Sequence, residues 1–371
     1  MIEMDFQSQS QLVDRIAKDM DGPHPSCWDA ILPPGFAEER FSEQLERRLR
    51  GLVCQPRVAV RGADHTNPSI RAFIQALHWQ WTETPSPPNP LHRSADLYFD
   101  MLFGLPELRS SKRPLILVLK RFHKVLDNLD KWVLGKLRTE EQARRLHTIV
   151  ITPLPLSSLK KRWESHKHYF STSDYGDSRH ALVTAEAPNP VEVIRACQDL
   201  SIPDAVADYA RKLTGGYPEP LAAVLEWWDK QGRPELVPRT RGEMLDVARS
   251  QFATFVEWLD PLEDGQYRDQ VINLYHQVNP EEARDAFHNH PWREVVLEED
   301  GLRAEALGAA ALCAALDGTV DRKMSQSFWF EVTERARRLY ERGQYEAALR
   351  VLGSTGPDRL RPHDRVLQAH A

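Results

Sequence analysis

The distribution of hydrophobic residues predicts a set of short strands between residues 57 and 184. Pro114–Leu119 is a continuous apolar run, and His147–Thr152 has a β-branched apolar centre. Such segments are typical of strands that are buried on both faces of a parallel sheet. Weaker strand candidates are Arg57–Arg61, His78–Thr82 and Ala181–Thr184. Helical segments separate these candidates, so we predict an α/β fold with a mainly parallel sheet flanked by helices.

Helical patterns precede and follow this region. Gln11–Met20 and Ala37–Leu49 carry apolar residues at helical spacing, with the proline-rich segment PHPSCWDAILPPG between them. Thr139–Gln142 has the form of a capping box that opens a helix. Asn189-Pro190 and Pro218 are expected to begin helices, and Gly215-Gly216 to end the helix Asp204–Leu213. Farther on, Arg293–Leu297 is a strand candidate followed by a turn.

These patterns divide the chain into five predicted parts. They are a helical lead-in (1–50), an α/β core (51–188), a helical segment (189–240), a mixed, mainly helical segment (241–318), and a helical hairpin with a tail (319–371).

Composition excludes several classes of protein. The chain has 371 residues, of which 41% are hydrophobic and 27% charged, so it can form packed cores. Ala306–Leu316, the longest apolar run, is too short to span a bilayer. The four cysteines are scattered without a disulfide framework, and MIEMDFQSQS does not resemble a signal peptide. We therefore expect a cytoplasmic protein without a membrane partner.

The net charge of -6 is unevenly distributed. Between Arg109 and Phe170, 15 basic residues oppose five acidic residues, which gives this stretch a charge of +10 and the remainder -16. Solvated helix faces commonly produce such a run, whereas nucleic-acid binding is the functional alternative, with Lys160, Lys161 and Arg162 as its candidate residues.

The order of these parts resembles the P-loop ATPase modules of the AAA+ and STAND (NACHT-like) families over about residues 50–320. VAVRGADHTNPSIRAF is similar to their strand, phosphate loop and helix, and RPLILVLKRFH to the strand that ends in catalytic acids. HTIVITPLPLSSL resembles the strand whose last polar residue senses phosphate, and KLTGGYPEPLAAVLEWW the STAND lid motif. ARRLYERGQYEAALRVL resembles a tetratricopeptide hairpin. The resemblance implies a P-loop-type sheet in the ATPase-like core (51–188), a helical lid over residues 189–240 and a winged-helix-like domain over residues 241–318. It also implies a role in bacterial signalling or defence.

The motifs depart from those of active ATPases. In the resembling segment Gly62 and Ser69 remain, but Asn67 replaces the second glycine and Pro68 replaces the lysine of G-x-x-x-x-G-K-[ST]. Lys120-Arg121 stands where two acids are expected, and cations cannot ligate Mg²⁺. We therefore expect no ATP hydrolysis, no catalytic residue and no cofactor.

Three interpretations of this region stay open. It is an inert scaffold derived from an ATPase, an ordinary α/β domain with only architectural similarity, or a metal-independent nucleotide switch. In the last case Gly62, Asn67, Ser69, Lys120 and Arg121 would bind the nucleotide or another anion.

Two further sets of residues are candidates for binding. The histidine pairs His166/His168 and His288/His290 lack the other ligands of a zinc site, so we expect surface histidines and no metal. A single tetratricopeptide-like hairpin cannot bury its apolar faces alone. Its candidate partner-binding residues are Phe328, Trp329, Tyr340, Tyr345 and Leu349.

The function that these observations favour is that of a non-catalytic regulatory or adaptor protein. It would act through protein–protein contacts or self-association on a degenerate ATPase-like scaffold, with nucleic-acid binding and nucleotide sensing as the alternatives.

Overall fold

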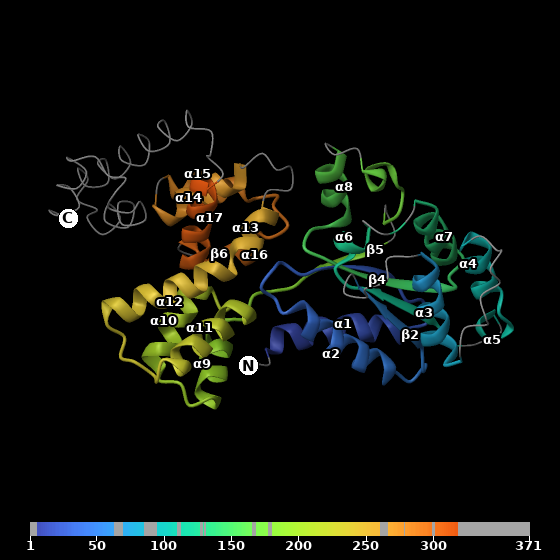
Figure 1. Ribbon diagram of the computed structural model, residues 1–371, viewed down its shortest axis with the longest axis horizontal. Helices are drawn as coiled ribbons and strands as arrows, with labels where there is room; N and C mark the ends of the chain where they lie inside the picture. The colour runs from blue at the N-terminus through green and yellow to red at the C-terminus, as the bar shows by residue number, and fades with distance from the viewer. Residues whose placement is uncertain are drawn as a thin grey trace. The chain divides into compact units, whose positions relative to one another are not determined.

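The computed structural model divides the chain into two compact units (Figure 1). One, the sheet unit, comprises residues 5–188 and 261–263, and the other, the helical unit, comprises residues 1–4, 189–260 and 264–371. The structure describes residues 6–62, 70–84, 95–109, 113–126, 129, 131–164, 168–176, 180–259, 266–277, 279–298 and 301–317.

The sheet unit is built on a five-stranded parallel sheet with the order β2-β3-β4-β1-β5. Its strands are β1 (Cys27–Ile31), β2 (Arg57–Arg61), β3 (Leu115–Leu119), β4 (Leu146–Thr152) and β5 (His180–Thr184). Every residue of β1, β3 and β4 is buried, which explains why β3 is entirely apolar and β4 has an apolar centre. The predicted α/β class and parallel sheet are confirmed.

Helices cover both faces of this sheet. They are α1 (Gln7–Met20), α2 (Glu38–Arg50), α3 (Ile70–Thr82), α4 (Ala95–Gly104), α5 (Pro106–Arg109), α6 (Phe122–Val125), α7 (Lys131–Gln142) and α8 (Leu156–Glu164), with a 3₁₀ turn at Tyr169–Thr172. Figure 1 shows α1 and α2 on one face and α6 and α7 on the other. The connection from β1 to β2 crosses the sheet in one direction, and the later connections cross it in the opposite direction. Right-handed crossovers therefore place the helices of these two sets of connections on opposite faces.

Three expectations for the sheet unit are wrong. Residues 1–50 are not a separate helical lead-in, because Cys27–Ile31 lies between β4 and β5 inside the sheet. His78–Thr82 is not a strand but the end of α3, where His78 and Trp81 face the core at helical spacing. Thr139 does not open a helix, because it lies near the end of α7 and its hydroxyl bonds the Gly135 carbonyl.

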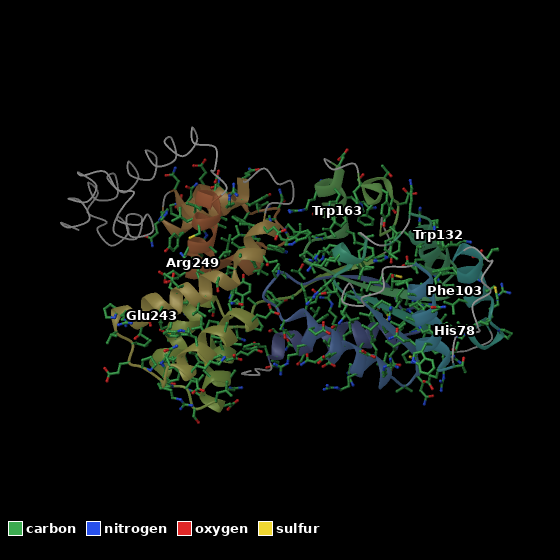
Figure 2. All side chains as sticks on the ribbon, in the orientation of Figure 1. His78, Phe103, Trp132, Trp163, Glu243 and Arg249 are labelled. Carbon is green, nitrogen blue, oxygen red and sulfur yellow. The ribbon has the colours of Figure 1, made fainter. Side chains whose placement is uncertain are left out.

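An aromatic cluster joins α3, α4 and α7. Phe99 packs against Phe103 and against Trp132, with ring centroids 5.0 and 6.1 Å apart. The indole of Trp81 meets the edge of Phe103 and donates a hydrogen bond to the Ile116 carbonyl. Figure 2 labels Phe103 and Trp132, which lie on neighbouring helices. These contacts fix the helices at the β2–β3 side of the sheet.

The helical unit is almost entirely α-helical. Its helices are α9 (Pro190–Asp199), α10 (Asp204–Thr214), α11 (Pro218–Lys230), α12 (Pro238–Gln251), α13 (Ala253–Leu259), α14 (Gln266–Tyr275), α15 (Pro280–Ala286), α16 (Arg293–Val296) and α17 (Glu305–Asp317). The expected helix starts at Asn189 and Pro218 are confirmed, and Asn189 caps α9 by accepting from the Glu192 N–H. Gly215 ends α10 with φ of 64°.

A short antiparallel pair, β6 (Leu297–Glu298) and β7 (Gly301–Leu302), precedes α17. The expected strand Arg293–Leu297 is therefore mostly wrong, since Arg293–Val296 is helical. The core of this unit contains Tyr217, whose hydroxyl donates to the Val295 carbonyl in α16 over 2.7 Å. Around it pack the rings of Phe252, Phe255 and Trp292.

The predicted C-terminal hairpin, with Phe328, Trp329, Tyr340, Tyr345 and Leu349, lies outside the described residues. Within the described residues, no helix combines the length and apolar character needed to cross a bilayer.

Candidate functional site

The strand order places a ligand-binding crevice at the carboxyl ends of β1 and β4. The chain leaves β1 toward β2 on one side, whereas β4 connects to β5 on the opposite side. Open parallel sheets bind ligands where neighbouring strands connect in opposite directions in this way. The candidate site is therefore formed by the segment between β1 and α2 and by the residues that follow β3 and β4.

The segment after β1 has the length of a phosphate loop but a different chemistry. It reads Leu-Pro-Pro-Gly-Phe-Ala-Glu-Glu over residues 32–39. Aligned with G-x-x-x-x-G-K-[ST], it has Leu32 and Ala37 at the glycine positions and Glu38 and Glu39 at the lysine and hydroxyl positions. Ala37 adopts φ of 52°, the left-handed conformation that favours glycine. This segment therefore shares its length and one left-handed residue with a phosphate loop, but not the lysine and hydroxyl side chains.

This alignment corrects the expected position of the phosphate loop. Gly62 follows β2, which is an edge strand and is separated from β1 by β3 and β4. Asn67 and Ser69 lie outside the described residues. The strand Cys27–Ile31 was not predicted from the sequence, because it is short and lies between prolines. The loop length from Leu32 to Glu39 was the signal that could have identified it.

The two acids after β1 bind the two cations after β3. The Arg121 backbone N–H donates to the Glu38 carboxylate over 2.6 Å, and the Arg121 guanidinium lies 3.9 Å from the same group. The Lys120 ammonium forms a salt bridge with the Glu39 carboxylate. Glu38 and Glu39 also lie in the first turn of α2, where negative charge is favoured by the helix dipole.

Lys120 is held against the end of β2. Its side chain is buried, with the residue 8% exposed, and its backbone N–H donates to the Arg61 carbonyl. A Cβ added at Gly62 would lie 2.5 Å from Cγ of Lys120, so the absent side chain leaves room for the lysine stem. Gly62, Lys120 and Arg121 are thus brought together, as expected, but around carboxylates of the chain itself.

The end of β4 is linked to β1 by a buried carboxyl group. Asp29 accepts hydrogen bonds from the Leu156 N–H at 2.9 Å and from the Thr152 hydroxyl at 3.2 Å. The same hydroxyl lies 2.7 Å from the Leu154 carbonyl, so Thr152, the expected phosphate sensor, is engaged within the loop. Asp29 was not singled out from the sequence.

Burial dominates the titration of both carboxyl groups at this edge. It raises the pKa of Asp29 to about 6, although the bonds from Leu156 and Thr152 oppose the rise. It raises the pKa of Glu38 to about 7, against the favourable effect of the Arg121 N–H and guanidinium. The crevice therefore disfavours additional negative charge, which is the opposite of what a nucleotide phosphate site requires.

The candidate nucleic-acid residues Lys160, Lys161 and Arg162 lie on α8 and do not share one solvent-exposed surface. Arg162 is buried at 7% exposure, and the Lys160 ammonium lies 5.6 Å from the centre of the Phe170 ring. Lys161 is exposed. One of the three side chains is therefore buried, one contacts an aromatic ring and one is exposed to solvent.

The expectation of surface histidines is wrong for His290. It is buried, its Nε2 lies 2.9 Å from the Leu259 carbonyl, and its Nδ1 accepts from the Trp292 N–H. Burial lowers the pKa of His290 to about 4, so the imidazole is neutral. His166 lies outside the described residues.

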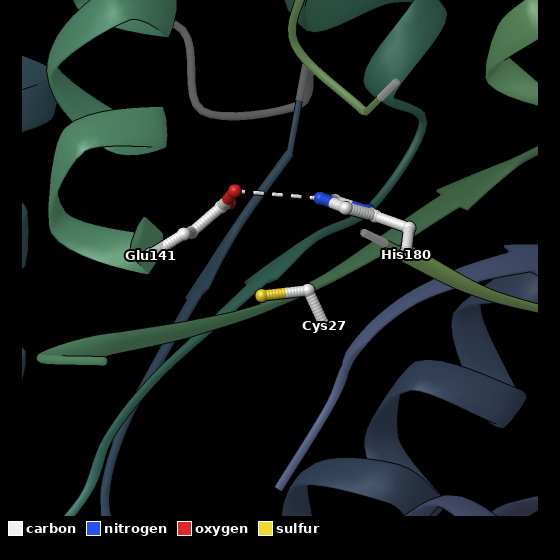
Figure 3. A group of neighbouring side chains, drawn as sticks. All are labelled: Cys27, Glu141 and His180. Atoms are coloured by element: carbon white, nitrogen blue, oxygen red, sulfur yellow. Dashed lines mark hydrogen bonds and ion pairs between the residues drawn. The ribbon is translucent and has the colours of Figure 1, made fainter. Parts of the chain in front are cut away.

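One group of side chains that the sequence did not indicate has the composition of a metal site. Ligand atoms of Cys27, Glu141 and His180 lie within 4.8 Å of one another at the amino ends of β1 and β5 (Figure 3). His180 Nε2 lies 3.5 Å from Glu141 Oε2, and Glu141 also accepts from the Thr148 hydroxyl. His180 Nδ1 has no hydrogen-bond partner among the described residues, although metal-bound histidines normally have one. These contacts connect α7 to β5 without requiring a metal.

Comparisons with known proteins bear on the fold. No family model and no curated protein matches the chain. Among solved structures, a Walker-type ATPase of Pyrococcus abyssi has 10% identity and a TM-score of 0.50, covering 84% of this chain and 96% of that one. The ORC2 protein of Aeropyrum pernix has 12% identity and a TM-score of 0.46, covering 85% and 86%. A RuvB variant of Thermotoga maritima has 10% identity and a TM-score of 0.40, covering 84% and 88%.

At these identities the similarity concerns architecture alone. The expected resemblance to P-loop ATPases is confirmed at the level of the fold by the Pyrococcus protein, and the STAND subtype, the winged helix and the tetratricopeptide hairpin stay predictions. The chain has an α/β fold similar to that of this Walker-type ATPase, and in it Glu38 and Glu39 after β1 pair with Arg121 and Lys120 after β3.

Proposed function

We propose that this protein is a non-catalytic regulatory or adaptor protein built on a Walker-type ATPase scaffold. It acts through protein–protein contacts, and its sheet unit neither binds ATP at the carboxyl edge nor hydrolyses it. The bacterial signalling or defence context and the cytoplasmic location implied by the sequence resemblance belong to the same proposal.

The observation that carries the proposal is the exchange of charges between two strand ends. In an active site of this fold, a lysine after β1 binds phosphates, while acids after β3 hold Mg²⁺ and orient water. Here Glu38 and Glu39 follow β1, whereas Lys120 and Arg121 follow β3. The side chains neutralise each other across the crevice, so the protein supplies internally the electrostatic balance that Mg²⁺ and triphosphate would provide.

Binding of MgATP at this edge would meet unfavourable electrostatic contacts. A phosphate at the start of α2 would meet two carboxyl groups, and it would have to displace Glu39 from Lys120. Magnesium prefers carboxylate and other oxygen ligands, but at the end of β3 it would meet the cations Lys120 and Arg121. This argument favours an inert scaffold over the metal-independent nucleotide switch.

The adaptor role predicts a defined protein complex in the native cell extract. Affinity purification of the full chain, with and without nuclease, should recover the same protein partner or the same self-associated form in both samples. Loss of the complex on nuclease treatment would instead favour the nucleic-acid alternative. The buried position of Arg162 and the contact of Lys160 with Phe170 give that alternative little support.

The C-terminal segment is the proposed contact element, on the sequence argument that one apolar hairpin needs a covering surface. Removal of residues 327–371 should leave a folded protein that no longer elutes with its partner. A truncated protein that aggregates or melts at lower temperature would show instead that these residues belong to the core.

A further inference from the structure

A pocket opens at the amino ends of β3 and β4, at the edge of the sheet opposite the ATPase-like crevice. Its volume is about 350 Å³, within the range of small-molecule sites. Apolar side chains from three helices and one strand form part of its wall, among them Met20, Phe103, Leu108 and Leu115. Phe103 is labelled in Figure 2. The pocket can therefore accommodate a compact ligand with an apolar body.

Four arginines line the same pocket. They are Arg109, Arg113, Arg144 and Arg145, all from the stretch of residues 109–170 that carries a charge of +10. No acidic residue is among the described residues that line it. Other cations of this stretch pair elsewhere, such as Lys136 with Asp100. Four of the 15 basic residues of this stretch thus line one pocket.

Two of the arginines are oriented by neighbouring side chains. Arg113 donates to the side-chain oxygen of Gln55 over 2.8 Å. Arg145 binds both carboxylate oxygens of Glu140 in a bidentate pair at 2.7 and 2.9 Å. Glu140 therefore neutralises one of the four charges while fixing the guanidinium at the rim.

Arg144 occupies a backbone position that normally favours glycine. It follows α7 with φ of 54°, and the bonds from its N–H to the Glu141 carbonyl and from the Arg145 N–H to the Glu140 carbonyl close the helix end. A side chain in this conformation costs about 1 kcal/mol. A charged residue thus stands where glycine would fit better, and it lines the pocket.

We propose that this pocket binds the phosphate group of a small organic phosphomonoester, with the apolar body of the ligand against Phe103 and Leu108. The planar guanidinium forms paired hydrogen bonds with phosphate oxygens, and a cluster of arginines recognises a doubly charged group better than a single carboxylate. This site is separate from the ATPase-like edge, so the proposal is independent of the proposed function.

The test is calorimetric titration of the full-length protein with phenyl phosphate, with inorganic phosphate and phenol as probes of the two halves of the ligand. Phenyl phosphate should bind with a Kd below about 1 mM, and each half should bind about tenfold more weakly. Arg144→Gly should weaken phenyl phosphate binding by about tenfold, since it removes one charge-assisted contact. Its Tm should stay close to that of the wild type, because glycine suits the conformation.

Arg138→Gln is the matched control, because it removes a cation of the same stretch that pairs with Asp174 and does not line the pocket. It should leave the affinity unchanged. The proposal is overturned if phenyl phosphate does not saturate the protein, if Arg144→Gly binds it as tightly as the wild type, or if Arg138→Gln weakens binding equally.

Discussion

The Arg121 backbone N–H donates a 2.6 Å hydrogen bond to the Glu38 carboxylate, across a sequence separation of 83 residues. Arg121 has φ of 49°, and Ala37, which precedes Glu38, has φ of 52°. Both strand ends therefore turn through left-handed residues to bring an acid of one loop to the backbone of the other. This contact and the neighbouring Lys120–Glu39 salt bridge close the crevice by internal pairing.

The Glu38 contact should contribute measurably to stability. Glu38→Ala leaves the Arg121 N–H without its acceptor in a partly buried position, so we expect a loss of about 1–3 kcal/mol in the free energy of unfolding by urea. Glu43→Ala, an exposed acid on the same helix, is the control and should change stability by less than about 0.5 kcal/mol. Equal effects of the two changes would contradict the structural importance of the pair.

The raised pKa values of Glu38 and Asp29 predict a specific pH dependence. In the folded state the pKa of Glu38 is about 7 and that of Asp29 about 6, compared with ordinary values of 4.5 and 3.8. Between these values the folded protein therefore binds more protons than the unfolded chain, in which both groups have their ordinary pKa. Their contribution to the free energy of unfolding is therefore present at low pH and is lost as the pH rises toward about 7.

Glu38→Gln keeps an acceptor for Arg121 but cannot ionise. Its stability relative to the wild type should rise by about 1–3 kcal/mol between about pH 4 and about pH 8. Urea unfolding of both proteins across this range measures the difference. A difference that is constant with pH, or that falls, would show that the pKa of Glu38 is not raised.

The close approach of Gly62 to Lys120 predicts an unusually costly glycine substitution. Gly62→Ala places a Cβ 2.5 Å from Cγ of Lys120, which must move out of a buried site, so we expect a loss of about 1–3 kcal/mol. The control is Gly135→Ala in α7, where no atom lies within 4 Å of the added Cβ. That change should stabilise the protein by about 0.5–1 kcal/mol, because alanine favours the helix. Thermal unfolding that ranks the two variants in the opposite order would refute the packing argument.

We expect the group of Cys27, Glu141 and His180 to be stable without a metal. Only three ligands are present among the described residues, and Glu141 is already bound to Thr148 and His180. Added Zn²⁺ should therefore leave the Tm of the purified protein unchanged. Stoichiometric zinc uptake that disappears in Cys27→Ser would identify a metal site instead.

The sequence predicted the elements whose burial is uniform and missed those whose pattern is mixed. β3 and β4 were recognisable from their apolar residues, but β1 contains Asp29 and lies between prolines, so its pattern resembles a loop. The error on β1 displaced the expected phosphate loop to Gly62. The position of Lys120 and Arg121 at a strand end was predictable, whereas their pairing with Glu39 and Glu38 depends on strand order, which local patterns do not contain.

The central claim is that the carboxyl edge of the sheet no longer binds or hydrolyses ATP. The most direct measurement is MgATP titration combined with a phosphate-release assay on the Arg144→Gly variant, in which the arginine pocket is impaired. We predict neither saturable binding nor magnesium-dependent phosphate release above the protein-free blank. Saturable binding or turnover that is abolished by Lys120→Ala would contradict the account, since it would show that Lys120 serves a nucleotide rather than Glu39.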